Sequence, residues 1–366
     1  MLLDGIKTRT VFFDENRSCV RMLDQTRLPF AIEWLDLKSP MDAVNAIASM
    51  QVRGAPAIGA VAAYGMALAC KQSNSIESLK QTAETLKAAR PTAVNLAWAV
   101  DRQLGVLERA PVAQWQVLAL AEANAICDED VAACETIGEF GADLIAAIAQ
   151  RKNGQTVNIL THCNAGWLAT VDWGTALAPI YKAAERGIDV HVWVDETRPR
   201  NQGASLTALE LSEQGIAHTL IADNSGGHLM QHGKVDCCIV GTDRTSANGD
   251  VCNKIGTYLK ALAAHDNHVP FYVALPTSTI DFSIQSGFDT PIEERSEDEV
   301  LYVNGLTDEG DITRVRIAPP STPAANPAFD VTPARLVSGL ITEKGVVDAT
   351  RTALTGLQNQ YHRVDQ

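Results

Sequence analysis

From Gly154 onward, short apolar runs alternate with segments that have a helical pattern. The apolar runs lie at 157–160, 189–194, 218–222, 235–240 and 270–275, and helical segments lie near 174–186, 203–214 and 253–265. Strands separated by helices of this length pair in parallel through right-handed crossover connections. We therefore predict a doubly wound, Rossmann-like parallel sheet in an α/β domain that spans residues 151–366.

The first 150 residues predict a different kind of domain. Short apolar runs such as 19–23 indicate a few short strands before residue 40. Ser39 and Pro40 then form a typical helix start, with serine as the cap and proline in the first turn. Ala-rich helical segments follow at 57–71, 75–89, 92–109 and 112–150. We therefore expect an N-terminal, mainly helical domain with a small β region over residues 1–150.

Composition excludes several classes of function. The net charge of −14 leaves no basic face for a nucleic acid, although a few local Arg and Lys residues still allow a small anionic substrate. No run approaches the ~20 apolar residues that span a bilayer, and the N-terminus lacks the basic region of a signal peptide. The eight cysteines show no disulfide framework, which indicates reduced thiols in a cytoplasmic protein. His and Cys do not cluster with metal-ligand spacing, so we do not expect a zinc site.

Polar side chains follow three of the predicted strands. Cys163 comes after the run 157–160, Glu196 and Arg198 come after 189–194, and Asp243 comes after 235–240. The carboxyl ends of parallel strands meet at one edge of a sheet, and ligands bind there. We therefore expect these side chains to share one site.

Three further segments have the composition of a phosphate site, each with an ordinary alternative. Arg53-Gly54-Ala55 precedes an apolar helix, Arg90 lies at a helix boundary, and Asn253-Lys254 follows a glycine-bearing loop that leads into a predicted helix. Backbone N–H groups at a helix start bind phosphate, and a neighbouring cation strengthens the interaction. Taken singly, each segment fits equally well a helix cap with a solvated charge.

Together these segments resemble the methylthioribose-1-phosphate isomerase family, which shares its fold with ribose-1,5-bisphosphate isomerases and with regulatory subunits of the exchange factor for eukaryotic translation initiation factor 2. The matching stretches are LDQTRLP (23–29), VRGAPAIGAVAAYG (52–65), RPTAVNLAWA (90–99), LTHCNAG (160–166), DETRPRNQGASLTALEL (195–211), GTDRTSANGDVCNKIGTY (241–258), VPFYVALPTSTID (269–281) and NPAFDVTPARLVSGLITEKGV (326–346). The Cys163 and Asp243 motifs are those of the isomerases rather than of the translation-factor subunits. Asn201 and Cys252 depart from the family pattern, in which Leu and Ala are more usual.

The resemblance implies conversion of 5-methylthioribose 1-phosphate to 5-methylthioribulose 1-phosphate in methionine salvage, without a metal or cofactor. It implies that Asp243 is the proton donor and that Cys163 stabilises or shuttles charge. It further implies a homodimer and a set of substrate-binding residues, namely Arg53, Gly54, Ala55, Arg90, Gln202, Asn253 and Lys254. The position of Cys163 just past a strand also predicts a thiol with a tendency toward thiolate.

Two other functions are compatible with the same fold. A ribose-1,5-bisphosphate isomerase needs a second cationic phosphate site, which Arg198 and Arg200 are candidates to provide. A non-catalytic regulatory subunit that senses a sugar phosphate or nucleotide needs neither Cys163 nor Asp243, and the presence of both argues against it.

Overall fold

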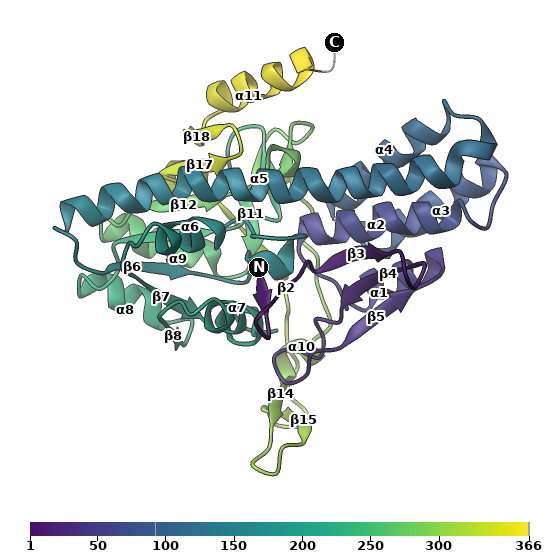
Figure 1. Ribbon diagram of the computed structural model, residues 1–366. Helices are drawn as coiled ribbons and strands as arrows, with labels where there is room; N and C mark the ends of the chain where they lie inside the picture. Colours follow the sequence, from purple (N-terminus) through teal and green to yellow (C-terminus); the bar gives the residue numbers. More distant parts are fainter. Residues whose placement is uncertain (92, 365–366) are drawn as a thin grey trace.

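The computed structural model describes residues 1–91 and 93–364. A helical half and an α/β half lie side by side, and one long helix runs along both of them (Figure 1). The N-terminal sheet is antiparallel and has the order β3 (Val11–Asp14), β4 (Cys19–Leu23), β5 (Trp34–Leu37), and a separate short hairpin pairs β1 (Leu2–Leu3) with β2 (Ile6–Lys7). The predicted short strands before residue 40 are therefore present.

The helical half begins where the sequence predicts it. Ser39 caps the first helix, because its Oγ accepts a hydrogen bond from the backbone N–H of Asp42 at 3.2 Å while the Asp42 carboxylate accepts from the Ser39 N–H at 2.8 Å. The helices are α1 (Pro40–Ala48), α2 (Ala55–Ala69), α3 (Ile76–Ala89), α4 (Val94–Leu107) and α5 (Trp115–Arg151). Helix α2 is the buried centre of this half, and its alanines and glycines let the neighbouring helices approach closely.

Helix α5 joins the two hydrophobic cores. It has 37 residues, a length of about 55 Å at the usual rise per residue. Trp115 and Ile126 pack into the helical core, whereas Ile137 and Ile148 pack against the large sheet. Among the described residues, no helix combines the length and apolar character that crossing a membrane requires. The predicted division at residues 150 and 151 falls at the C-terminal end of this shared helix and stays a prediction.

The α/β half contains a seven-stranded sheet with the order β8-β7-β6-β9-β12-β17-β18. Its strands are β6 (Val157–Thr161), β7 (Val190–Asp195), β8 (His218–Ile221), β9 (Cys237–Val240), β12 (Phe271–Ala274), β17 (Gly339–Thr342) and β18 (Gly345–Val347). All neighbours pair in parallel except the edge strand β18. The predicted doubly wound sheet is confirmed, and β17 and β18 extend it beyond the five predicted strands. The chain order reverses between β6 and β9, which places a switch point there.

Helices cover both faces of this sheet. They are α6 (Ala178–Glu185), α7 (Ala208–Glu213), α8 (Ser225–Gln231), α9 (Thr257–Asp266) and the C-terminal α11 (Arg351–Val364). Successive strand residues point to opposite faces, so Cys237 packs with α5 and α6 whereas Cys238 packs with α8 and α9. Both thiols are fully buried core residues.

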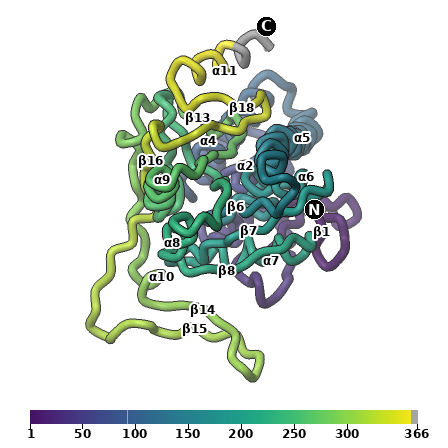
Figure 2. Tube along the Cα trace, turned by 90° about the vertical axis from the view of Figure 1, so that its left-hand side faces the viewer, coloured from purple at the N-terminus to yellow at the C-terminus, as the bar shows by residue number. Residues whose placement is uncertain are grey.

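A second, smaller sheet corrects the prediction of a helix from residue 253. It contains β13 (Ile280–Asp281), β10 (Arg244–Ser246), β11 (Val251–Lys254) and β16 (Phe329–Thr332) in that order. Asn253 and Lys254 pair with Asp330 and Phe329, so both belong to a strand, and α9 begins only at Thr257. The connection from β13 to β16 carries the short helix α10 (Asp298–Leu301) and a hairpin, β14 (Tyr302–Leu306) and β15 (Ile312–Arg316), which projects from the body (Figures 1 and 2).

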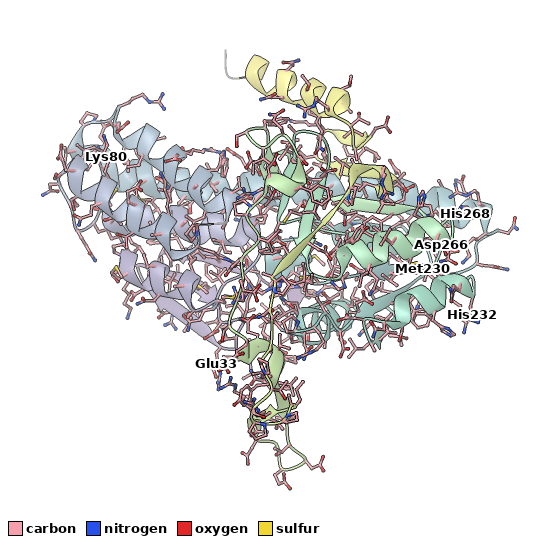
Figure 3. The ribbon with its side chains drawn as sticks, turned by 180° about the vertical axis from the view of Figure 1, so that it is seen from behind. Glu33, Lys80, Met230, His232, Asp266 and His268 are labelled. Carbon is pink, nitrogen blue, oxygen red and sulfur yellow. The ribbon has the colours of Figure 1, made fainter. Side chains whose placement is uncertain are left out.

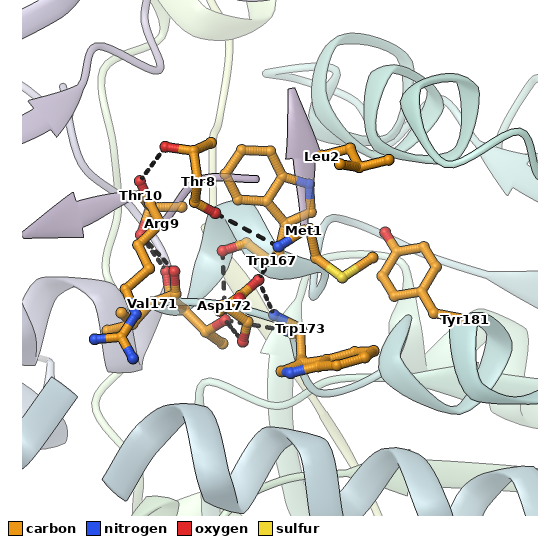
Figure 4. A network of polar contacts seen from close by, with 12 residues as sticks. Met1, Leu2, Thr8, Arg9, Thr10, Trp167, Val171, Asp172, Trp173 and Tyr181 are labelled. Carbon is orange, nitrogen blue, oxygen red and sulfur yellow. Dashed lines mark hydrogen bonds and ion pairs between the residues drawn. The ribbon is translucent and has the colours of Figure 1, made fainter. Parts of the chain in front are cut away.

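A polar network attaches the N-terminal strands to the segment that follows β6 (Figure 4). The amino group of Met1 forms an ion pair with Asp172 and donates to the Thr8 carbonyl at 3.4 Å. The Thr10 N–H donates to the Val171 carbonyl at 3.1 Å, and the Val171 N–H donates to Asp130 of α5 at 2.8 Å. These contacts fix the position of the segment after β6, which forms one wall of the site described below.

Asp130 gives this network a pH dependence. Burial is the main cause that raises the pKa of its carboxyl from 3.8 to about 7. Because the folded pKa is raised, the stability that Asp130 contributes is fully present below about pH 4 and is lost as the pH rises through 7. Asp130→Asn keeps an acceptor for the Val171 N–H and does not ionise. Between pH 5 and pH 8 we therefore expect the wild type to lose about 1–3 kcal/mol of unfolding free energy relative to this variant.

Urea unfolding of the two proteins at both pH values measures this difference. Because other groups also titrate in this range, only the change in the gap between the two proteins reports on Asp130. A gap that stays constant with pH would contradict the assignment.

Candidate active site

A cavity lies over the carboxyl ends of β6 and β9, at the switch point of the sheet. It is bounded by the start of α2, the loops after β6 and β9, and the end of β11. The nine residues predicted to be catalytic or to bind substrate all line this one cavity: Arg53, Gly54, Ala55, Arg90, Cys163, Gln202, Asp243, Asn253 and Lys254. The expectation that Glu196 and Arg198 share the site is not met, because neither lines the cavity and Arg198 donates instead to the Pro199 and Val300 carbonyls. Residues from both halves of the chain thus meet at the edge of the sheet where ligands of such folds bind.

Gly54 brings the start of α2 against the cavity. Its φ of 90° lies in the left-handed region, and a Cβ there would come within 2.2 Å of the Ala169 carbonyl oxygen. The helix begins at Ala55 without a side-chain cap. The positive end of the helix dipole and its unpaired backbone N–H groups therefore face the cavity, which favours an anion.

Arg53 is buried and is held on one side by Asn164. Its Nη2 donates to the Asn164 carbonyl at 2.9 Å and to Asn164 Oδ1 at 2.8 Å. Asn164 in turn donates to Glu210 Oε1 at 2.7 Å. Glu210 also accepts hydrogen bonds from Tyr181 and from two backbone N–H groups, and burial raises the pKa of its carboxyl to about 7. Sequence reasoning missed Asn164 and Glu210, although both lie within motifs that carry the resemblance.

Two more cations reach the cavity. Lys254 donates to the Ala328 carbonyl at 2.8 Å, and its ammonium lies 4.6 Å from the centre of the Phe329 ring. Arg90 ends helix α3 and extends into the same space. Burial lowers the pKa of both side chains, which shows that charge here is poorly solvated. In a protein with a net charge of −14, this concentration of positive charge indicates an anionic ligand.

Cys163 has a constrained backbone and a thiol whose pKa is raised. Its φ is 68°, its N–H donates to Thr197 Oγ1 at 2.8 Å, and its carbonyl accepts from Thr207 Oγ1 at 2.7 Å. Left-handed backbone at a residue other than glycine is often found at functional sites. Burial raises the pKa of the thiol and outweighs the opposing charges of Arg53 and Lys254. The prediction of a tendency toward thiolate is therefore wrong, because proximity to a strand end does not offset the loss of solvent.

Asp243 separates the cavity from a smaller, largely apolar recess. Its N–H donates to the Cys252 carbonyl at 3.0 Å, which fixes the loop after β9 to β11. Asp243 lines both spaces, and Ile58, Cys252 and Phe329 line the recess. Cys252 is a buried packing residue, as its substitution for a small residue suggested. Asn201 lines a neighbouring open cavity rather than the one that contains Asp243.

The segment between β13 and β16 supplies residues that sequence reasoning missed. Arg295 lines the cavity and donates through Nη2 to Glu299 Oε1 at 2.7 Å. Arg200 lines it as well and donates to the same oxygen at 2.9 Å. No motif in the sequence marks Arg295, because only the course of this long connection brings it to the site.

The histidines lie in different parts of the molecule, and His162 is one that lines the cavity. His232 and His268 lie at the outer end of the α/β half, and Lys80 marks the outer end of the opposite, helical half (Figure 3). His162 by contrast lines the cavity next to Cys163. It forms a group with the buried Asp195 and the partly exposed Asp223 whose atom types suit a metal ion. The ammonium of Lys260 already supplies a cation there, since it lies 3.1 Å from Asp195 Oδ2 and donates to the Asp223 carbonyl.

Comparison with known proteins agrees with this geometry. A sequence model of the initiation factor 2 subunit family matches residues 51–349. A methylthioribose-1-phosphate isomerase of Methylorubrum extorquens is 60% identical over 99% of this chain and 100% of its own length. This chain belongs to the methylthioribose-1-phosphate isomerase family. The crystal structure of 5-methylthioribose 1-phosphate isomerase from Pyrococcus horikoshii superposes with a TM-score of 0.82, at 41% identity over 96% of each chain.

The wider family also includes proteins with another name. A crystal structure named as the delta subunit of translation initiation factor eIF-2B, from A. fulgidus, superposes with a TM-score of 0.77 at 40% identity. It covers 93% of this chain and 96% of its own. The shared fold alone therefore does not separate the isomerases from the translation-factor branch, and the residues of the site have to do so.

Proposed function

We propose that this chain converts 5-methylthioribose 1-phosphate to 5-methylthioribulose 1-phosphate, and the names of the relatives from Methylorubrum extorquens and Pyrococcus horikoshii, both isomerases of methylthioribose 1-phosphate, support this. The single observation that supports it best is the cavity at the switch point, where Arg53, Arg90 and Lys254 line the same space as the carboxyl group of Asp243 and the thiol of Cys163. The phosphate of this substrate is attached to the anomeric carbon. The sugar therefore has no free aldehyde, and the enzyme has to open the ring while it keeps the phosphate ester.

The residues of the cavity have separate roles in this proposal. Arg53, Arg90 and Lys254 bind the phosphate together with the backbone N–H groups at the start of α2. Asp243 gives a proton to the ring oxygen, which allows the C1–O bond of the ring to break. Cys163 lies at the reacting carbons, where it stabilises charge or exchanges a proton as hydrogen moves between C2 and C1. Gln202 and Asn253 position the sugar.

Proton NMR of two candidate substrates tests the proposal. With 5-methylthioribose 1-phosphate we expect the anomeric proton signal to disappear and the signals of the ketose to replace it. Ribose 1,5-bisphosphate is the comparison substrate, and conversion of that compound alone would reject the proposal. Arg198 and Arg200 are poor candidates for a second phosphate site, because Arg198 donates to the Pro199 and Val300 carbonyls and Arg200 to Glu299.

The regulatory alternative makes a different prediction in the same experiment. A subunit that only senses a sugar phosphate binds either compound and leaves both spectra unchanged. The similarity to the structure named as an eIF-2B subunit is the reason to test this alternative. The presence of Cys163 and Asp243 in one cavity favours catalysis.

The proposal includes a cytoplasmic homodimer, as the resemblance implies. Light scattering at micromolar concentration measures the assembly, and we expect twice the mass of the 39.3 kDa chain. A stable monomer under these conditions would contradict this part of the proposal without affecting the proposed reaction.

A further inference from the structure

His162 is held on both sides of its ring by oxygen atoms. Nδ1 lies 2.8 Å from Asp195 Oδ2, and Nε2 lies 2.9 Å from the Ile255 carbonyl oxygen. The ring is 1% exposed and the Asp195 side chain is fully buried. A carbonyl oxygen only accepts hydrogen bonds, so Nε2 carries a proton.

The second ring nitrogen faces a carboxylate that also forms an ion pair with a third residue. Lys260 Nζ lies 3.1 Å from the same oxygen of Asp195 that contacts His162. A carboxylate paired with an ammonium only accepts hydrogen bonds. Both ring nitrogens therefore donate, and the neutral ring, with its single N–H, satisfies only one of the two oxygens.

The hydrogen bond between His162 and Ile255 connects two segments that carry residues of the site. His162 directly precedes Cys163, and Ile255 directly follows Lys254. The ring packs closely against the turn after Lys254, where a Cβ on Gly256 would come within 2.9 Å of His162 Cε1. Asp330 supports the same turn by accepting from the Gly256 N–H at 2.7 Å.

We infer that His162, with both ring nitrogens protonated, is a positioning residue that joins the loop of Cys163 to the strand end that carries Lys254. Asp195 and Lys260 complete the arrangement by holding the ring in its doubly donating form. The inference rests on the proposed function for its kinetic consequences, whereas the protonation of the ring is independent of any activity.

The first experiment measures protonation directly. In protein labelled with ¹⁵N-histidine, one ring should show two protonated nitrogens at pH 7, and this signal should be absent from His162→Gln. Asp195→Asn should convert the same ring to a neutral form that keeps the Nε2–H, because the amide then donates to Nδ1. A wild-type His162 with one unprotonated nitrogen would overturn the inference, whatever the protein does to its substrate.

The second experiment separates positioning from folding. His162→Gln offers a single amide in place of the two ring donors, and we expect kcat to fall about 10–100-fold with a smaller change in KM. Asp195→Asn keeps both hydrogen bonds of the ring, so its kcat should stay closer to the wild-type value. Equal losses in the two variants, or a folded His162→Gln with wild-type kcat, would overturn the inference.

Failure of His162→Gln to fold leaves the decision to the NMR measurement and to Asp195→Asn. If the wild type converts neither sugar phosphate, the proposed function fails, and the NMR result still decides the state of the ring.

Discussion

Asp243→Asn is expected to lower kcat by about 10²–10⁴, because the amide cannot give a proton to the ring oxygen of the substrate. The substitution keeps the volume of the side chain. It also leaves intact the backbone hydrogen bond from residue 243 to the Cys252 carbonyl, so the loop after β9 should keep its position. Substrate binding should therefore change much less than turnover. Steady-state kinetics by proton NMR, with circular dichroism to confirm folding, measures both quantities.

A double variant shows whether Asp243 and Cys163 act on the same transition state. Cys163→Ser should also lower kcat, because a hydroxyl is a weaker acid than a thiol and carries negative charge poorly at neutral pH. If the two residues act together, the double variant should be little worse than the more damaged single variant. Losses that multiply fully would mean independent action. Near-wild-type turnover in Asp243→Asn would remove that residue from the mechanism.

Arg53→Ala is expected to weaken substrate binding by about 2–5 kcal/mol, because it removes a buried, forked donor from a phosphate that is shielded from water. Arg53 is 7% exposed, and Asn164 already occupies one side of its guanidinium. Little solvent is therefore available to replace the guanidinium as a partner of the phosphate. Lys254→Ala should weaken binding in the same direction. KM and kcat/KM report the effect, provided that kinetics under single-turnover conditions confirm that KM follows binding.

Two control variants make this result specific. Arg53→Lys keeps the charge but loses the fork that contacts Asn164, and it should recover only part of the lost binding. Arg17→Ala removes an exposed arginine that pairs with Asp36 away from the cavity, and it should leave KM unchanged. Unchanged KM and kcat/KM in both Arg53→Ala and Lys254→Ala would reject the phosphate site.

Several of the nine predicted residues could be placed at one site by local rules. Apolar runs, glycine and proline mark three of the elements that form the site. They are a strand that ends before Cys163, a strand that ends before Asp243, and a helix that starts at Ala55. Once parallel pairing is inferred, the ends of β6 and β9 have to lie at one edge of the sheet. The family resemblance then supplied Gln202, which no local rule selects, and favoured a substrate-binding role for Arg90 over a helix cap with a solvated charge.

Other features depend on contacts between distant parts of the chain. Asn253 and Lys254 lie in a strand because β16, more than 70 residues later, offers hydrogen bonds to their backbone. Arg295 reaches the cavity because of the path of the connection between β13 and β16, which no periodic pattern marks.

The sequence by itself therefore determined five strands of the large parallel sheet, the start of the helical half and the residue types of the site, because caps, turns and apolar periodicity act between near neighbours. Only the tertiary structure decided the protonation of Cys163 and the double hydrogen bonding of His162. Burial raises the pKa of the thiol, and two oxygens from β7 and from the turn after β11 enclose the imidazole ring. Desolvation and the approach of distant acceptors are properties of the packed molecule, and no short stretch of sequence contains them.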